Sequence, residues 1–155
     1  MTSRVLTATA TVAASPDRVF ELLTDPARHH EFDATGMVGH PVTPARLTHV
    51  GQVFVMNMTY REDGHVEHYQ SDNHLCVIEP GHAISWATAT HGGPPLGWLW
   101  RYDVEPVADG TAVTLTYDWT STPPENVSRF GVPLADADGL GRSLQLLARA
   151  CEARP

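Results

Sequence analysis

Two adjacent segments of the chain alternate apolar and polar side chains with a period of two residues. In each segment the apolar positions share one parity and include large aromatic side chains: Trp98, Trp100, Tyr102 and Val104 in the first, and Val113, Leu115, Tyr117 and Trp119 in the second. A short turn containing Asp109 and Gly110 separates the two segments. Because successive side chains of a strand point to opposite faces, this pattern predicts a β-hairpin with one apolar and one wet face.

Similar alternation predicts further strands earlier in the chain. The expected strands are residues 5–12, a short strand near Met37, residues 52–61, residues 66–79 and residues 83–90. The apolar side chains that share one face of segment 52–61 are Phe54, Met56, Met58 and Tyr60. Both faces of segment 66–79 carry polar residues, and a bulge would switch its parity, so the face that points inward stays open.

A different spacing predicts three helices. Ser15, Pro16 and Asp17 provide an N-cap, a first-position proline and a first-turn acid, which together start a short helix that ends near Thr24. A second short helix is expected over residues 26–32. The last helix begins near Asp136 or Asp138, and its apolar stripe consists of Leu140, Leu144, Leu147, Ala148 and Cys151.

The order of these elements predicts an α+β fold. A sheet with one apolar face must bury that face, and the C-terminal helix is the long amphipathic element available to cover it. We therefore expect a curved antiparallel sheet of six to seven strands wrapped around a long C-terminal helix, with two short helices after the first strand. The length of 155 residues suits one domain that spans residues 1–155.

The facing surfaces of the predicted sheet and helix differ in bulk, which suggests a ligand cavity between them. The sheet presents aromatic side chains and methionines, whereas the helix presents leucines and alanines. A solid aromatic core is the alternative interpretation, and the pattern does not decide between them. The residues expected to contact a ligand are Phe54, Met56, Met58, Trp86, Trp98, Trp100, Trp119 and Leu144.

Composition restricts the partners of the protein. The formal net charge is −8, with only 10 Lys and Arg residues and no basic run. Nucleic acids and anionic membrane surfaces are therefore poor partners, because both require a cationic patch. The sequence has no secretory signal and no apolar run that spans a membrane, so we expect a cytoplasmic protein. Two cysteines, Cys76 and Cys151, are too few for a disulfide scaffold.

Several segments resemble the SRPBCC superfamily, whose START-like or helix-grip fold includes bacterial polyketide cyclases/dehydrases and the birch-pollen allergen group. The segments that carry the resemblance are TATATVAASPDRVFELLTDPARHHEFD (7–33), GQVF (51–54), VIEPGHAISW (77–86), WRYDVEPVADGTAVTLTYDWTS (100–121) and SLQLLARACE (143–152). The resemblance implies a deep apolar pocket between the sheet and the C-terminal helix. Members of the superfamily include aromatase/cyclases, lipid and sterol carriers and quinone-binding proteins.

Candidate catalytic groups must point into this pocket. Tyr60, Tyr102 and Tyr117 have inward parity, and each is either a hydrogen-bond donor to substrate or a packed core residue. His68 with Asp72 would form a general base and its orienting carboxylate if their face of segment 66–79 looks inward; a solvated outer face is the alternative. Asp33 is a candidate for the pocket entrance or a loop acid.

The nine histidines do not form a recognisable metal-binding motif, so we expect neither a metal nor another cofactor. Family cyclases tend to place an arginine inside the cavity, whereas Arg61 and Arg101 have outward parity and Arg129 lies in an irregular segment. This departure weakens the cyclase assignment without removing it.

Two main functional hypotheses follow from the sequence. The protein is either a polyketide cyclase/aromatase-like enzyme, of lyase or isomerase type, that acts on a small hydrophobic molecule, or a non-catalytic carrier or sensor of a lipid, quinone or aromatic metabolite. An interaction module that pairs through its outer sheet face is a third possibility. The sequence leaves open whether the protein is a monomer or a homodimer.

Overall fold

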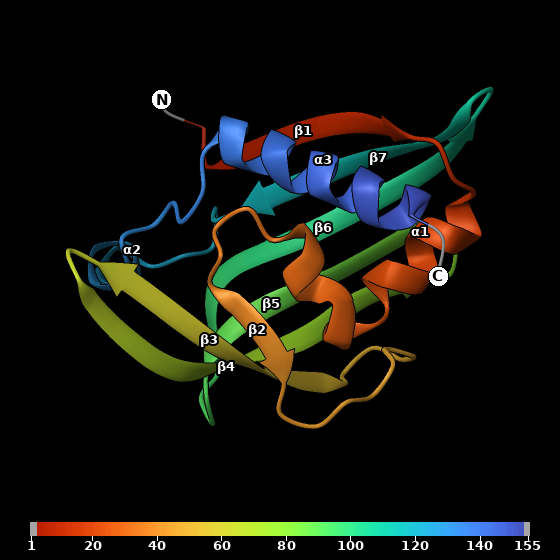
Figure 1. Cartoon of the computed structure of the whole chain (residues 1–155). Helices are drawn as coiled ribbons and strands as arrows, with labels where there is room; N and C mark the ends of the chain where they lie inside the picture. The colour runs from red at the N-terminus through yellow and green to blue at the C-terminus, as the bar shows by residue number, and fades with distance from the viewer. Residues whose placement is uncertain (1–2, 154–155) are drawn as a thin grey trace.

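The structure is a computed structural model that describes residues 3–153 (Figure 1). Its helices are α1 (Pro16–Leu23), the 3-10 helix η1 (Pro26–Phe32), α2 (Pro124–Phe130) and α3 (Ala137–Glu152). Its strands are β1 (Val5–Val12), β2 (Val38–Pro41), β3 (Val53–Glu62), β4 (His65–Glu79), β5 (Ala83–Thr90), β6 (Pro95–Val107) and β7 (Gly110–Asp118). The strands form one antiparallel sheet in the order β1-β7-β6-β5-β4-β3-β2, which confirms the predicted α+β helix-grip fold.

The helices begin where side chains satisfy their free backbone N–H groups. The Ser15 hydroxyl accepts a hydrogen bond from the Arg18 N–H at 3.2 Å and starts α1. The Asp25 carboxylate accepts from the Ala27 N–H at 3.2 Å and starts η1. Of the two acids expected to cap the last helix, Asp136 is the N-cap, because its carboxylate accepts from the Gly139 N–H at 2.7 Å.

The β6–β7 hairpin has the predicted register. Trp100 lies opposite Tyr117 and Tyr102 lies opposite Leu115, so the aromatic side chains share one face. Gly110 closes the turn with a φ of 141°, and a Cβ atom at this position would lie 2.1 Å from the Val12 carbonyl oxygen. The hairpin can therefore approach β1 closely only because residue 110 is a glycine.

Helices cover one face of the curved sheet, which we call the inner face. Figure 1 shows α3, α1 and η1 on this side of the sheet. The side chains of α3 that are buried are Leu140, Leu144, Leu147 and Cys151, which belong to the predicted apolar stripe. Within residues 3–153, no helix is long and apolar enough to cross a membrane.

Helix α2 was not predicted, because its segment lies among prolines and its side chains are only partly buried. Pro124 occupies its first turn with Glu125, and Gly131 ends it in the left-handed conformation with a φ of 68°. These are ordinary helix start and stop signals. The segment was not predicted as a helix because it has no apolar stripe.

The pairing of β4 with β3 decides which face of β4 points inward. Phe54 lies opposite Asn73, and Met56 lies opposite Ser71. Since paired residues of antiparallel strands share a face, Ser71 and Asn73 belong to the inner face. The register shifts between Leu75 and Val77, which is a bulge that changes the parity of the strand at this point.

Candidate ligand-binding site

One part of the inner face is a packed cluster of aromatic side chains beneath η1, which we call the η1 cluster: His29, Phe32, Phe54, Trp86 and Tyr102. All five side chains are buried. The His29 ring stacks on Trp86 with their centroids 5.1 Å apart, and Trp86 lies 5.5 Å from Phe54 and 5.8 Å from Tyr102. This part of the inner face follows the solid-core interpretation, since the rings fill the space between η1 and the sheet.

His29 is a central residue of the η1 cluster, and sequence analysis considered it only among the nine histidines that form no metal-binding motif. Its Nε2 lies 2.8 Å from the Leu23 carbonyl oxygen, so Nε2 carries the proton and donates it. Burial lowers the pKa of His29 to about 4 despite this hydrogen bond. The ring is therefore neutral at pH 7. The spacing of three residues between His29 and Phe32 was the signal that both side chains face the sheet.

A second aromatic group on the inner face is a stack formed by Trp100, Tyr117 and Trp119. The Trp100 and Tyr117 rings are nearly parallel, with centroids 4.1 Å apart and an interplanar angle of 9°. The centroids of Tyr117 and Trp119 are 5.2 Å apart. Trp100 is only half-buried, so a planar side chain of this stack remains accessible. We call this group the Tyr117 stack.

The Tyr117 hydroxyl accepts one hydrogen bond, but its own proton is not donated to any described residue. The oxygen accepts a hydrogen bond from the Leu134 N–H at 3.0 Å. No residue among 3–153 accepts a hydrogen bond from its proton. Burial raises the pKa of Tyr117 to about 12, so the hydroxyl stays protonated at neutral pH. The hydroxyl therefore keeps a donor that the described residues leave unused.

A hollow of about 400 Å³ lies between the sheet and the start of α3, and we call it the α3 hollow. The residues that line it are Ser3, Arg4, Leu6, Trp119, Pro133, Ala135, Asp136 and Ala137. Leu6 lies opposite Tyr117 across the β1–β7 ladder, and Trp119 is part of the Tyr117 stack. The hollow therefore borders the aromatic stack, and its volume lies within the range of small-molecule sites.

The three predicted tyrosines occupy different environments. Tyr102 and Tyr117 are buried on the inner face, as expected. Tyr60 is 37% exposed at the far end of β3, where its hydroxyl donates to Glu62 at 2.8 Å. It borders a separate hollow of about 220 Å³ next to Met37. The structure does not bring Tyr60 together with the other two tyrosines.

The condition for a catalytic pair of His68 and Asp72 is not met, because both lie on the outer face of β4. Asp72 instead accepts hydrogen bonds from His91 Nδ1 and the Gly92 N–H, each at 2.8 Å. His68 is exposed, and its Nδ1 lies 3.2 Å from the Thr59 hydroxyl. Both faces of β4 carry polar residues, so the sequence did not predict which face points inward. Parity shows which residues of a strand share a face, but it does not show whether that face is the inner or the outer one.

Two inward polar residues of β4 are Ser71 and Asn73, which sequence analysis did not select. Both are buried. The Asn73 side-chain amide donates to the Phe54 carbonyl oxygen at 3.3 Å and its oxygen accepts from the Thr88 hydroxyl at 3.3 Å. Asp33 serves its own turn, since its carboxylate accepts from the Thr35 and Val38 N–H groups at 3.0 and 2.9 Å.

The remaining residues expected to contact a ligand also lie on the inner side. Met56 and Leu144 are buried and Met58 is partly buried. Trp98 is buried against Phe130 of α2, with ring centroids 5.6 Å apart. In the described part of the chain, no three His, Cys, Asp or Glu side chains are grouped in a way that would hold a metal ion.

The curved sheet and the long helix that it grips define the class of helix-grip proteins. A model of the polyketide cyclase/dehydrase and lipid transport family matches residues 3–152, and the chain belongs to this family. An uncharacterized protein of Mycobacterium tuberculosis, Rv0088, is 31% identical over 110 residues, which are 70% of this chain and 44% of that protein. The match thus spans less than half the length of this curated relative.

Solved structures share the fold at low sequence identity. Protein CV1439 from Chromobacterium violaceum has a TM-score of 0.68 at 18% identity, over 97% of this chain and 99% of that chain. The Zhui aromatase/cyclase from a Streptomyces species has a TM-score of 0.61 at 16% identity, over 96% of this chain and 93% of that chain. At such identities the similarity shows the fold alone.

Proposed function

We propose that the protein binds a small hydrophobic molecule that carries oxygen, such as an aromatic or polyketide-like compound, in the α3 hollow against the Tyr117 stack. The observation that carries this proposal is the buried Tyr117 hydroxyl, which keeps a free proton and accepts from Leu134, whose chain neighbours Pro133 and Ala135 line the α3 hollow. A buried donor without an acceptor costs free energy unless a bound molecule supplies one. The flat rings of Trp100 and Trp119 offer stacking surfaces for an aromatic ligand.

The protonation states favour binding over acid–base catalysis. Tyr117 stays protonated at neutral pH and acts as a donor, whereas a general base must be able to accept a proton. His29 is the buried histidine of the inner face, but its pKa of about 4 makes it a weak base, and it is enclosed in the η1 cluster. A non-catalytic carrier or sensor is therefore the function that the geometry supports best.

Cyclisation or dehydration of the bound molecule is the second candidate function. The family description and the aromatase/cyclase among the structural relatives favour it. In that case the Tyr117 hydroxyl would donate a hydrogen bond to a carbonyl oxygen and stabilise the charge that develops on it as an enolate forms. The base would have to come from outside the groups described above or from the substrate.

The first experiment is native mass spectrometry of the purified protein, followed by denaturing extraction of any bound molecule. We expect a hydrophobic, oxygen-bearing compound that dissociates on denaturation. Incubation with the extracted compound would then separate the two functions, because a carrier returns it unchanged and a cyclase converts it. If neither an extracted compound nor any member of an aromatic polyketide panel binds, the proposal is wrong.

Tyr117→Phe tests the residue that carries the proposal. Loss of one neutral hydrogen bond should weaken the binding of an oxygen-bearing aromatic ligand about 2- to 10-fold. Tyr60→Phe is the matched control, because it removes the same hydroxyl from an exposed site outside the α3 hollow. Equal affinities for the wild type and Tyr117→Phe, measured by calorimetry, would exclude the role assigned to this hydroxyl.

A further inference from the structure

The basic side chain that lines the α3 hollow is Arg4. Arg4 directly precedes β1, and its carbonyl oxygen accepts a hydrogen bond from the Trp119 N–H at 2.9 Å, which extends the β1–β7 register by one residue pair. Since side chains two residues apart in a strand share a face, Arg4 lies on the same face as Leu6. Figure 1 shows the start of β1 beside the start of α3, and residues of both segments line the hollow.

The Arg4 guanidinium keeps most of its hydrogen-bond donors free. Within residues 3–153 its one hydrogen bond goes from Nη1 to the Thr122 carbonyl oxygen at 3.4 Å, which is long for a hydrogen bond. It forms no ion pair with a carboxylate of the described residues. The arginines that do pair with an acid are Arg18, Arg28, Arg46 and Arg101. Because a guanidinium has five N–H donors and a permanent positive charge, Arg4 can still bind an anion.

The other charged residue of the hollow, Asp136, is used by α3. Its carboxylate accepts from the Gly139 N–H at 2.7 Å and caps the helix. Its negative charge disfavours an anion beside the helix start, so an anionic group of a ligand belongs on the Arg4 side of the hollow. The apolar residues of the lining are Leu6, Trp119, Pro133, Ala135 and Ala137. The hollow thus combines apolar walls with one cation that has no ion-pair partner among residues 3–153.

We propose that the ligand of the α3 hollow is a hydrophobic carboxylic acid whose carboxylate binds the Arg4 guanidinium. This inference rests on the function proposed above and narrows its ligand class. A carboxylate matches the planar fork of arginine, since two parallel N–H···O bonds can form between them. The apolar part of the acid would lie against Leu6 and Trp119. The net charge of −8 opposes unspecific binding of anions, so the capture of an acid requires a local cation such as Arg4.

A matched pair of probes tests the contact: 2-naphthoate, which is an anion at neutral pH, and 2-naphthamide, which has the same ring and a similar size but no charge. Their binding to the full chain is measured by equilibrium dialysis. We expect Arg4→Gln to weaken binding of 2-naphthoate about 3- to 10-fold and to change binding of 2-naphthamide less than about 2-fold. Arg4→Lys should keep part of the preference for the acid, because an ammonium group retains the charge but not the planar fork.

Arg61→Gln is the matched control, because it removes the same charge from an exposed arginine that lines the separate hollow next to Met37. It should leave the affinities for both probes unchanged. If Arg4→Gln affects the two probes equally, or if Arg61→Gln alone weakens binding of 2-naphthoate, Arg4 does not bind the carboxylate and the inference is wrong. Binding of 2-naphthamide that Ala135→Phe abolishes would still support the proposed function in that case. If the wild-type protein binds neither probe and no other apolar ligand, the proposed function itself is wrong.

The wild-type protein provides a second test, which serves if Arg4→Gln does not fold. Addition of 2-naphthoate should shift the Arg4 Nε–H signal in NMR spectra of the nitrogen-labelled protein, whereas 2-naphthamide should leave this signal in place. A signal that does not move while 2-naphthoate is bound would exclude the contact.

Discussion

His29 illustrates how burial changes the chemistry of a single residue. The ring donates one hydrogen bond to Leu23 and stacks on Trp86, where water does not reach. The charged form would lose its hydration without gaining a carboxylate partner in hydrogen-bonding contact. Desolvation therefore outweighs the backbone hydrogen bond, and the pKa falls from 6.5 to about 4.

This lowered pKa predicts a pH dependence of stability. Between pH 6.5 and pH 4 the unfolded chain takes up a proton at His29 that the folded protein resists, so the stabilising contribution is full above pH 6.5 and decreases as the pH falls. Between pH 7.5 and pH 4.5, the free energy of unfolding of His29→Gln should fall by about 2–3 kcal/mol less than that of the wild type. Urea denaturation of both proteins at the two pH values measures this difference. Equal losses would show that His29 titrates normally.

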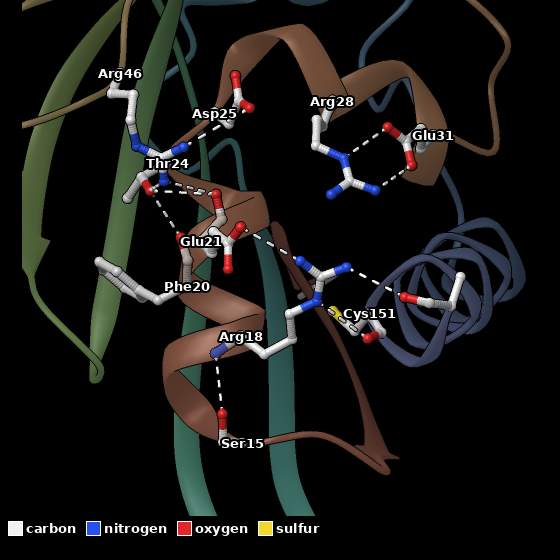
Figure 2. Close-up of polar contacts among 11 residues, drawn as sticks. Ser15, Arg18, Phe20, Glu21, Thr24, Asp25, Arg28, Glu31, Arg46 and Cys151 are labelled. Atoms are coloured by element: carbon white, nitrogen blue, oxygen red, sulfur yellow. Dashed lines mark hydrogen bonds and ion pairs between the residues drawn. The ribbon is translucent and has the colours of Figure 1, made fainter. Parts of the chain in front are cut away.

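At the scale of elements, helix α1 contacts the C-terminal end of α3 through polar groups. Figure 2 shows the Arg18 side chain between the two helices. Its guanidinium donates to the carbonyl oxygens of Cys151 at 3.2 Å and Ala153 at 3.3 Å, and it lies 3.3 Å from the Glu21 carboxylate. Free carbonyl groups at a helix C-terminus attract cations, so Arg18 fixes this end of α3.

Arg18→Leu should therefore destabilise the protein by about 1–3 kcal/mol, because it leaves two carbonyl groups without their donor. Arg18→Lys should recover part of the loss, since an ammonium group keeps the charge but not the planar fork. The matched control is Arg28→Leu. Among residues 3–153, the Arg28 guanidinium in Figure 2 donates only to Glu31 of its own helix, at 2.8 and 2.9 Å, and such pairs contribute about 0.5 kcal/mol or less. Similar losses for both leucine variants in urea denaturation would contradict this assignment.

At the scale of the whole molecule, the inner face is divided into two regions. The η1 cluster is filled by its own side chains, whereas the Tyr117 stack borders the α3 hollow. The filled region supplies the apolar burial that holds the helices on the sheet. Under the proposed function, the ligand occupies the hollow and leaves the packed core in place.

Ligand binding in the α3 hollow should raise the melting temperature of the whole protein. A ligand at 100 times its Kd adds about 2.7 kcal/mol, which corresponds to a rise of roughly 5–10 °C for a chain of this size. Ala135→Phe, which fills the hollow, should abolish the rise. Thr7→Phe on the exposed outer face is the control and should retain it. A rise that survives Ala135→Phe in thermal melts would place the ligand elsewhere.

The sequence by itself determined the elements whose signals are local. Side-chain alternation established the β6–β7 hairpin, and caps such as Ser15 located the helix starts, because these features depend on residues only a few positions apart. The order of elements then favoured the helix-grip fold, since an apolar sheet face needs one long amphipathic helix to cover it.

Only the tertiary structure decided the features that depend on pairing between distant segments. The inward face of β4 was set by its register with β3, which placed Asn73 inside and His68 outside. The burial of Trp98 depends on α2, whose Phe130 ring packs against it. Whether an aromatic side chain fills space or borders a hollow depends on which side chains of the opposite layer pack against it. The spacing of residues along one segment of the chain does not contain that information.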